Sequence, residues 1–284
     1  MGATLADKIP TVEISRKKGC SVRVVCLLYH DVIEGNNWDS SGFTGPGTAR
    51  YKLSRAEFVA HLGAIAKVRG DEPYRAHDLL KPGAASFPFL LTFDDGGGSA
   101  STCIAELLQQ YGWYGHFFVT AGKIGERGFL TRSQIRELRR NGHIIGSHSF
   151  SHPVRMSQCS REQLLHEWTT SIQILSDILG EPVDTASVPG GYYSKLVGQT
   201  AAAVGVRVLF NSEPTTEVRH IFGCVLVGRF NIFKATPPSL SEKLVSEKSK
   251  ARLQQWLFWN SKKIVKTVAG RPYLAARQLL LRKE

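Results

Sequence analysis

Short apolar runs alternate with helical patterns along most of this 284-residue chain. Runs that predict strands lie at residues 22–28, 88–93, 116–120, 143–147, 185–188, 206–210 and 224–227. Capping patterns or helical periodicity predict helices between them, at residues 55–68, 102–110, 131–140, 160–180 and 195–204. Such alternation favours parallel strands with helices packed outside them, in either an open doubly wound sheet or a barrel.

Polar residues that can carry chemistry follow these strands, and their distribution favours the barrel. They are His30, the pair Asp94 and Asp95, His148, Ser187 and Glu213, which belong to five different predicted strands. One barrel mouth collects residues from many strands, because the carboxyl ends of all the strands open onto it. A barrel commonly takes about 250 residues as a single unit, so the chain is long enough. We therefore predict an α/β barrel with its site at the mouth.

Two groups of these residues together suggest a metal site. An apolar run ends at Asp94 and Asp95 and is followed by three glycines, so both carboxylates sit where a buried strand emerges into a loop. Alone, this pattern also fits a strand end closed by an Asp turn. His148 and His152 are four residues apart, which puts both imidazoles on one face of a helical turn. With Asp95 they make a two-histidine, one-carboxylate set, the ligand type of a catalytic zinc with an open water position.

The sequence around these residues resembles a known family. The motifs are Thr92-Phe93-Asp94-Asp95-Gly96, Gly142-His143-x-x-Gly146-Ser147 and His148-Ser149-x-x-His152-Pro153. They resemble those of the polysaccharide deacetylases, the NodB-homology or carbohydrate esterase family 4 enzymes, and the resemblance covers roughly residues 22–235. It implies a distorted (β/α) TIM-like barrel with fewer than eight regular strands. It also implies a metal-dependent hydrolase that removes acetyl groups from N-acetylated sugars.

The resemblance assigns a role to each matching position. It makes Asp94 the general base, and Asp95, His148 and His152 the ligands of a divalent ion, for which we expect Zn²⁺. A divalent ion lowers the pKa of bound water from about 16 toward about 7, and a nearby carboxylate can then accept the proton during attack on the amide. The peptide N–H of Gly190 is expected to stabilise the oxyanion.

The chain departs from the family pattern at two places. Ser187 replaces the arginine that normally orients the base and cannot supply its charge. We predict that Arg229 supplies it instead, the alternative being an ordinary surface arginine. The late Leu-x-His motif that provides the general acid is not recognisable, and His30 is our candidate for acid or substrate ligand. The alternatives are a structural His30 bonded to Asp31, and a solvated His220 in a polar loop.

Aromatic and acidic residues near the predicted mouth are candidates for sugar binding. Trp38, Phe43, Tyr192 and Glu213 can stack on a sugar or hydrogen-bond to it, although aromatic residues near loops also serve in packing. The segment 34–51 is too long for a simple connection and is expected to be a cover or binding loop. Alternative functions are an O-acetyl esterase or non-sugar amidase of the same fold, and a non-catalytic carbohydrate-binding or scaffold protein.

The net charge of +12 is concentrated near the C-terminus, because residues 242–284 hold eleven Lys or Arg and three Glu, a net +8. This favours an anionic surface near the tail over a nucleic-acid groove in the main body. Apolar residues recur at roughly helical intervals at residues 252–268 and 273–281. Residues 250–284 are therefore expected either to contact an anionic membrane as basic amphipathic helices or to pack on the barrel.

These observations divide the chain into a polar lead-in at residues 1–21, a barrel domain at 22–239 and a basic helical tail at 240–284. The five cysteines contain no C-x-x-C pair, which argues against a disulfide framework or a thiolate zinc site. Neither a signal-peptide pattern nor a long apolar stretch is recognisable. We therefore expect a cytoplasmic location, peripheral at the inner membrane face, and an N-acetylated glycan substrate on a polysaccharide, oligosaccharide or lipid carrier.

Overall fold

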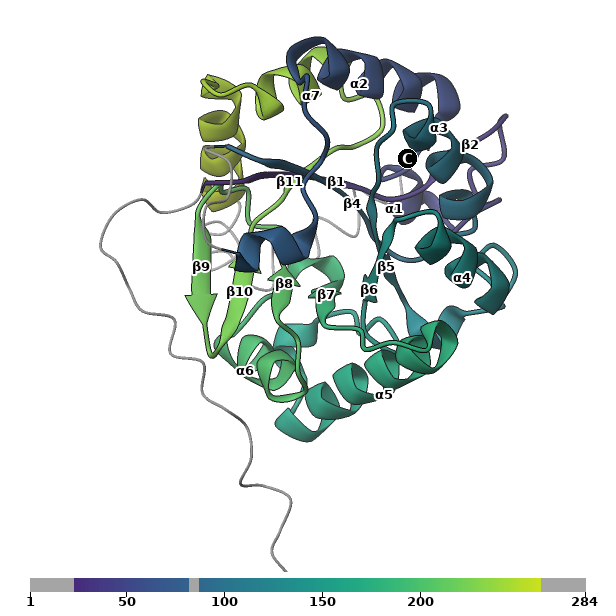
Figure 1. Ribbon diagram of the computed structural model, residues 1–284, viewed down its shortest axis with the longest axis vertical. Helices are drawn as coiled ribbons and strands as arrows, with labels where there is room; N and C mark the ends of the chain where they lie inside the picture. The colour runs from purple at the N-terminus through teal and green to yellow at the C-terminus, as the bar shows by residue number, and fades with distance from the viewer. Residues whose placement is uncertain (1–22, 82–86, 262–284) are drawn as a thin grey trace, which may run out of the picture.

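A curled sheet forms the centre of the computed structural model, which describes residues 23–81 and 87–261 (Figure 1). The strand order is β11-β1-β4-β5-β6-β7-β8-β10-β9, and all neighbouring pairs are parallel except β10 and β9. The bounds are β1 (Val25–Tyr29), β4 (Phe89–Phe93), β5 (His116–Val119), β6 (Ile144–Ser147), β7 (Thr185–Ser187), β8 (Val208–Phe210), β9 (Val218–Ile221), β10 (Cys224–Val227) and β11 (Phe230–Asn231). The predicted lead-in at 1–21 and the tail beyond residue 261 lie outside the described residues.

The sheet curls back on itself through β1. The carboxyl-terminal half of β1 pairs with β11, while just before β1 the Val24 N–H donates to the Thr216 carbonyl at 2.9 Å. Arg23 forms an antiparallel bridge with Glu217, so the chain before β1 also meets the chain before β9. Among the described strands, β11 is the one parallel member of this sheet with only two residues. The predicted class, a distorted TIM-like barrel with fewer than eight regular strands, is confirmed.

Helices surround the sheet, and α2, α4, α5 and α6 begin within one residue of the predicted starts (Figure 1). They are α1 (Pro46–Ala49), α2 (Arg55–Val68), α3 (Ala105–Gln109), α4 (Arg132–Arg140), α5 (Arg161–Leu179), α6 (Lys195–Ala203) and α7 (Pro238–Val245), with a π-helical turn at Ala100–Ile104. Capping boxes at Ser54, Thr131 and Ser160 satisfy the first N–H groups of α2, α4 and α5. Among the described residues, none of the helices combines the length and apolar content of a membrane span.

Short or polar elements were not predicted. Strands β2 (Val32–Ile33) and β3 (Leu53–Ser54) pair with each other, and β9 contains Arg219 and His220 at the edge of the main sheet. His220 therefore lies in a strand and not in the loop that the sequence suggested, although its side chain is exposed as expected. Two-residue strands and half-exposed edge strands carry too few apolar residues to give a periodic signal.

Side chains of β4 alternate between two apolar clusters, and this alternation aims the strand end at the site. Leu90 packs inside the barrel with Phe118 and Phe210, whereas Phe93 belongs to the larger cluster between the sheet and the helices. Successive strand residues point to opposite faces, so Asp94 continues the inward series begun by Leu90. The Asp94 carboxylate therefore lies on the inner face of the barrel, at the end of an apolar interior.

The long segment 34–51 is organised around one buried ammonium. The Lys52 Nζ atom donates to the carbonyls of Trp38 at 2.7 Å, Ser41 at 2.7 Å and Phe43 at 2.6 Å. Lys52 is 2 % exposed, and burial lowers the pKa of its ammonium. Three carbonyls that converge on one cation give this segment a fixed shape without regular secondary structure.

Close packing inside the barrel makes Gly146 a sensitive position. A Cβ atom there would lie 2.6 Å from ring carbons of Phe118 and 2.7 Å from the Thr185 hydroxyl. We expect Gly146→Ala to lower the free energy of unfolding by about 1–3 kcal/mol through overpacking. Gly63→Ala in α2 is the matched control, because its Cβ would meet only the Tyr111 hydroxyl at 3.8 Å.

Urea denaturation checks this comparison. Gly63→Ala should raise the free energy of unfolding by about 0.5–1 kcal/mol, since alanine is the better helix former. Equal unfolding midpoints for the two variants would contradict the packing described inside the barrel.

Candidate metal and catalytic centre

A cavity of about 1070 Å³ opens at the carboxyl ends of the barrel strands. Most of the predicted site residues line it: His30, Asp94, Asp95, His148, His152, Gly190, Tyr192 and Glu213. They follow five strands, β1, β4, β6, β7 and β8, so the barrel gathers at one mouth residues that are far apart in sequence. Arg229 and Trp38 do not line the cavity.

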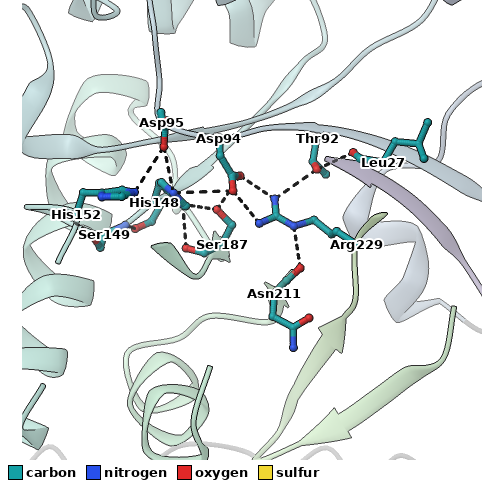
Figure 2. Close-up of polar contacts among 11 residues, drawn as sticks. Leu27, Thr92, Asp94, Asp95, His148, Ser149, His152, Ser187, Asn211 and Arg229 are labelled. Carbon is teal, nitrogen blue, oxygen red and sulfur yellow. Dashed lines mark hydrogen bonds and ion pairs between the residues drawn. The ribbon is translucent and has the colours of Figure 1, made fainter. Parts of the chain in front are cut away.

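Asp95, His148 and His152 converge on one point (Figure 2). The Nε2 atoms of His148 and His152 lie 3.4 and 3.6 Å from the Asp95 Oδ1 atom. One possible ligand atom from each of the three residues lies within 4.8 Å of the other two. Two imidazoles and a carboxylate are a donor set that suits Zn²⁺ or a similar divalent ion. Asp95 and His152 have φ angles of 77° and 58°, so both are held in the left-handed region that non-glycine residues rarely adopt. Such strain is typical of functional sites.

The hydrogen bonds of His148 fix which of its nitrogens faces the cluster (Figure 2). Its Nδ1 atom lies 2.5 Å from the Ser187 hydroxyl and 3.2 Å from the Ser187 carbonyl. The hydroxyl donates its own proton to the Asp94 carboxylate at 3.0 Å, so it can only accept from His148. The Nδ1 atom therefore carries the proton, and the Nε2 lone pair is directed at Asp95. This is the arrangement in which a histidine binds a metal and is oriented from behind.

Asp94 forms a two-point ion pair with Arg229. The Nη1 and Nη2 atoms of the guanidinium each donate to one carboxylate oxygen of Asp94 at 2.7 Å (Figure 2). Arg229 is fully buried, and Asp94 is 5 % exposed. Burial by itself would raise the pKa of the Asp94 carboxyl, but the charge and hydrogen bonds of Arg229 outweigh it and hold that pKa below its usual value. Asp94 is therefore ionised in the folded protein at neutral pH.

Arg229 is fixed from several sides. Its Nε atom donates to the Asn211 carbonyl at 2.9 Å, and its Nη1 atom lies 3.4 Å from the Thr92 hydroxyl. The rings of Phe118 and Phe210 lie 5.8 and 6.0 Å from the guanidinium carbon. The predicted guanidinium partner of Asp94 is thus present behind the cavity wall. The supporting positions at Thr92 and Asn211 were not predicted, although Thr92 is a polar residue at an inward position of an apolar strand.

His30 lies in the cavity and is not bonded to its neighbour. Its ring centroid is 4.9 Å from that of Tyr51, and its buried Nδ1 atom has no hydrogen-bond partner among the described residues. Asp31 instead accepts from the hydroxyls of Ser41 at 2.6 Å and Ser99 at 2.7 Å. Among the described residues, His30 and Asp31 form no hydrogen bond with each other, so the alternative of a structural His30–Asp31 pair is wrong. His220 does not line the cavity.

The predicted sugar-binding residues divide into two groups. Tyr192, Phe43 and Glu213 line the cavity, with the Phe43 ring 4.9 Å from that of His152 and the Glu213 carboxylate 2.9 Å from Arg219. Trp38 does not reach the cavity, because its carbonyl binds Lys52 and its ring lies 3.6 Å from the Lys234 ammonium. The lining also includes residues that the sequence did not indicate: Arg50, Tyr51, Lys52, Asn231 and Phe233.

Comparison with known proteins identifies relatives of the barrel. Residues 84–209 match the model of the family described as polysaccharide deacetylase. YxkH of Bacillus subtilis, provisionally named a polysaccharide deacetylase, is 24 % identical over 199 residues, which cover 66 % of this chain and 64 % of that protein. The peptidoglycan-N-acetylglucosamine deacetylase of Bacillus cereus is 28 % identical over 120 residues, or 42 % and 54 % of the two chains. The chain thus spans less than two thirds of the length of these relatives.

Solved structures show the same fold. The Streptococcus pyogenes deacetylase PplD in complex with acetate superposes with a TM-score of 0.66 and 20 % identity, covering 81 % of this chain and all of that one. The barrel is therefore the fold of known deacetylases.

The convergence of Asp95, His148 and His152 predicts that the protein binds Zn²⁺ tightly. We expect His152→Ala to weaken binding by at least about 100-fold, since loss of an outer-shell partner alone typically costs 10- to 100-fold. His220→Ala is the control, because this exposed histidine lies outside the cavity. Competition against a chromophoric chelator measures both affinities, and wild-type affinity in His152→Ala would rule out the site.

Proposed function

We propose that the barrel, whose residues 84–209 match the polysaccharide deacetylase family, is a metal-dependent hydrolase that removes acetyl groups from N-acetylated sugars. The observation that carries the proposal is the juxtaposition of two carboxylates with different partners. Asp95 faces two imidazoles, whereas Asp94 faces a guanidinium. One carboxylate is suited to hold an ion and the other to accept a proton.

The divalent ion that Asp95, His148 and His152 would hold supplies Lewis acidity, which lowers the pKa of a water molecule and stabilises negative charge on the carbonyl oxygen. The donor set of this chain favours Zn²⁺. Ser187 orients His148 and at the same time donates to Asp94. The same hydroxyl therefore couples the position of a metal ligand to the position of the base.

Asp94 is proposed to act as the general base through its Oδ2 atom. The Oδ1 atom accepts from both Arg229 and Ser187, whereas Oδ2 accepts from Arg229 and lies 3.8 Å from the His148 Nε2 atom. Oδ2 thus has spare acceptor capacity on the side of the ligand cluster, where a nucleophilic water would approach. Arg229 keeps the carboxylate ionised and fixes its plane, which prepares the base for proton transfer.

Two further residues are proposed for the acyl-transfer step. His30 lines the cavity, its buried Nδ1 atom has no hydrogen-bond partner among the described residues, and it is our candidate to protonate the departing amine. Gly190 lies at the cavity wall with a φ angle of 60°, a left-handed conformation that favours glycine. Its peptide N–H is proposed to donate to the developing oxyanion. Tyr192 and Glu213 are proposed to contact the sugar.

Acetate release tests the proposal directly. The Zn²⁺-loaded protein should release acetate from N-acetylglucosamine oligomers, and Asp94→Asn should lower kcat by about 10²- to 10⁴-fold, the usual contribution of a general base. The variant should retain Zn²⁺ affinity, because Asp94 is not among the proposed ligands. Undiminished acetate release by Asp94→Asn would exclude this residue as the base. Release from acetylated xylan alone would favour an O-acetyl esterase, and no release from any substrate would favour a binding protein.

Removing the guanidinium should shift the acid limb of the pH profile. Arg229→Met removes the positive charge that chiefly offsets the effect of burial on Asp94, so the pKa of the Asp94 carboxyl should rise. The base must be deprotonated to act, and kcat/KM should therefore begin to fall at a higher pH than in the wild type. Arg229→Lys, which keeps the charge but not the two-point contact, should give an intermediate profile. Coincident acid limbs for folded Arg229→Met and wild type would contradict the role of this pair.

A further inference from the structure

The last described segment is a helix at residues 250–261 that forms part of the cavity wall. It is the helix at the yellow end of the colour scale in Figure 1. Gln255, Phe258 and Trp259 line the same cavity as the catalytic candidates. The rim of the cavity is therefore built partly from the region that the sequence assigned to the basic tail.

The helix is attached firmly to the rest of the fold. The Arg252 guanidinium donates to the carbonyls of Leu244 at 2.6 Å, Ser246 at 2.5 Å and Glu247 at 2.6 Å. These carbonyls lie at or just beyond the end of α7, so one side chain both caps α7 and holds the following helix. Ala251 is buried beside them. The orientation of the helix relative to the cavity is consequently fixed.

A second face of this helix exposes large apolar side chains. Leu253, Trp256 and Leu257 are 57 %, 41 % and 53 % exposed, and their spacing of three and four residues puts them on one side. Phe258 is 61 % exposed and is also part of the cavity lining. Four of the nine exposed large apolar residues in the described parts of the chain thus lie within a single helix. Such a concentration marks an interaction surface, whereas scattered exposed residues do not.

Exposed cations lie at the start of this helix and on segments that form the cavity rim. Lys248 and Lys250 are exposed at the start of the helix, and the exposed Arg50 and Lys234 lie on the segments that form the rim. The region 242–284 as a whole carries a net +8. An apolar stripe with Trp and Leu beside exposed cations matches the boundary between lipid headgroups and acyl chains. A second copy of this chain would bring like charges together, which disfavours self-association through the same face.

We propose that the Leu253–Trp256–Leu257 face docks the protein on an anionic lipid bilayer, so that the membrane lies beside a helix that forms part of the cavity wall. The substrate is then an N-acetylated sugar carried on a lipid, whose head enters the cavity while its hydrocarbon stays in the bilayer. Docking rests on the helix alone. The assignment of the substrate rests in addition on the proposed deacetylase function.

Flotation of the full-length protein with vesicles tests the docking. The wild type should float with vesicles that contain phosphatidylglycerol and much less with pure phosphatidylcholine. Trp256→Glu combined with Leu257→Glu should lower the floating fraction at least about tenfold. The matched control is Val59→Glu combined with Phe222→Glu, which makes the same charge change at exposed apolar residues elsewhere and should float like the wild type.

Either of two results would overturn the docking: equal flotation of the Trp256/Leu257 variant and the wild type, or a wild-type protein that does not float. A concentration-dependent dimer that the same double substitution abolishes, without flotation, would assign the face to a second copy of the chain. Circular dichroism and acetate release from soluble N-acetylglucosamine oligomers, both at wild-type level, establish that the variant is folded.

The substrate class is tested with an N-acetylglucosaminyl lipid placed in the same vesicles. The Trp256/Leu257 variant should lose at least about tenfold in kcat/KM on this lipid while keeping wild-type kcat/KM on soluble oligomers. Equal losses on both substrates would overturn the lipid-borne assignment. Asp94→Asn should float as well as the wild type, so a failure of the catalytic proposal leaves flotation intact and the two failures are distinguishable.

Discussion

The structure of the site depends on the ion pair between Asp94 and Arg229. Both groups are buried, and the energetic cost of removing two charges from water is offset only when each finds its full set of partners. Arg229 meets this condition with two contacts to Asp94 and one to the Asn211 carbonyl, above the rings of Phe118 and Phe210. The pair links the end of β4 to the chain just after β10, across the barrel. Its geometry therefore fixes the base relative to strands that are not neighbours in the sheet.

The position of Ser187 explains how this chain can dispense with an arginine there. Asp94 needs a guanidinium that contacts it in the right orientation, and here Arg229 supplies it in place of residue 187. The smaller side chain at 187 then fits between His148 and Asp94 and bridges them with one hydroxyl. Arg229 and Ser187 both donate to Asp94, and His148 donates to Ser187, so hydrogen bonds connect these four residues in series. In the proposed mechanism, the base and a metal ligand are consequently positioned together.

Regular features of the sequence predicted the fold and the centre of the site, whereas long-range convergence could not be predicted. Apolar runs and capping boxes placed β4, β6 and α5 to within a few residues, because periodicity and local hydrogen bonds determine them. The position of Arg229 after the last strand made it a candidate partner of Asp94, with an ordinary surface arginine as the alternative, and the structure shows the contact. The three carbonyls that meet at Lys52, and the helix 250–261 against the cavity, depend on contacts between distant segments. Trp38 was misplaced relative to the cavity for the same reason, since its surroundings are set by Lys52 and Lys234.

The central claim is that Asp95, His148 and His152 hold a divalent ion beside an uncoordinated Asp94. Anomalous X-ray diffraction from crystals grown with Zn²⁺ and acetate tests it most directly. One strong anomalous peak is expected at about 2.0–2.2 Å from the Nε2 atoms of both histidines and from an Asp95 oxygen. Acetate should lie next to the ion, and Asp94 should still bind Arg229. A peak elsewhere, or an ion coordinated by Asp94 with the Arg229 contact broken, would exclude this division of roles between Asp94 and Asp95.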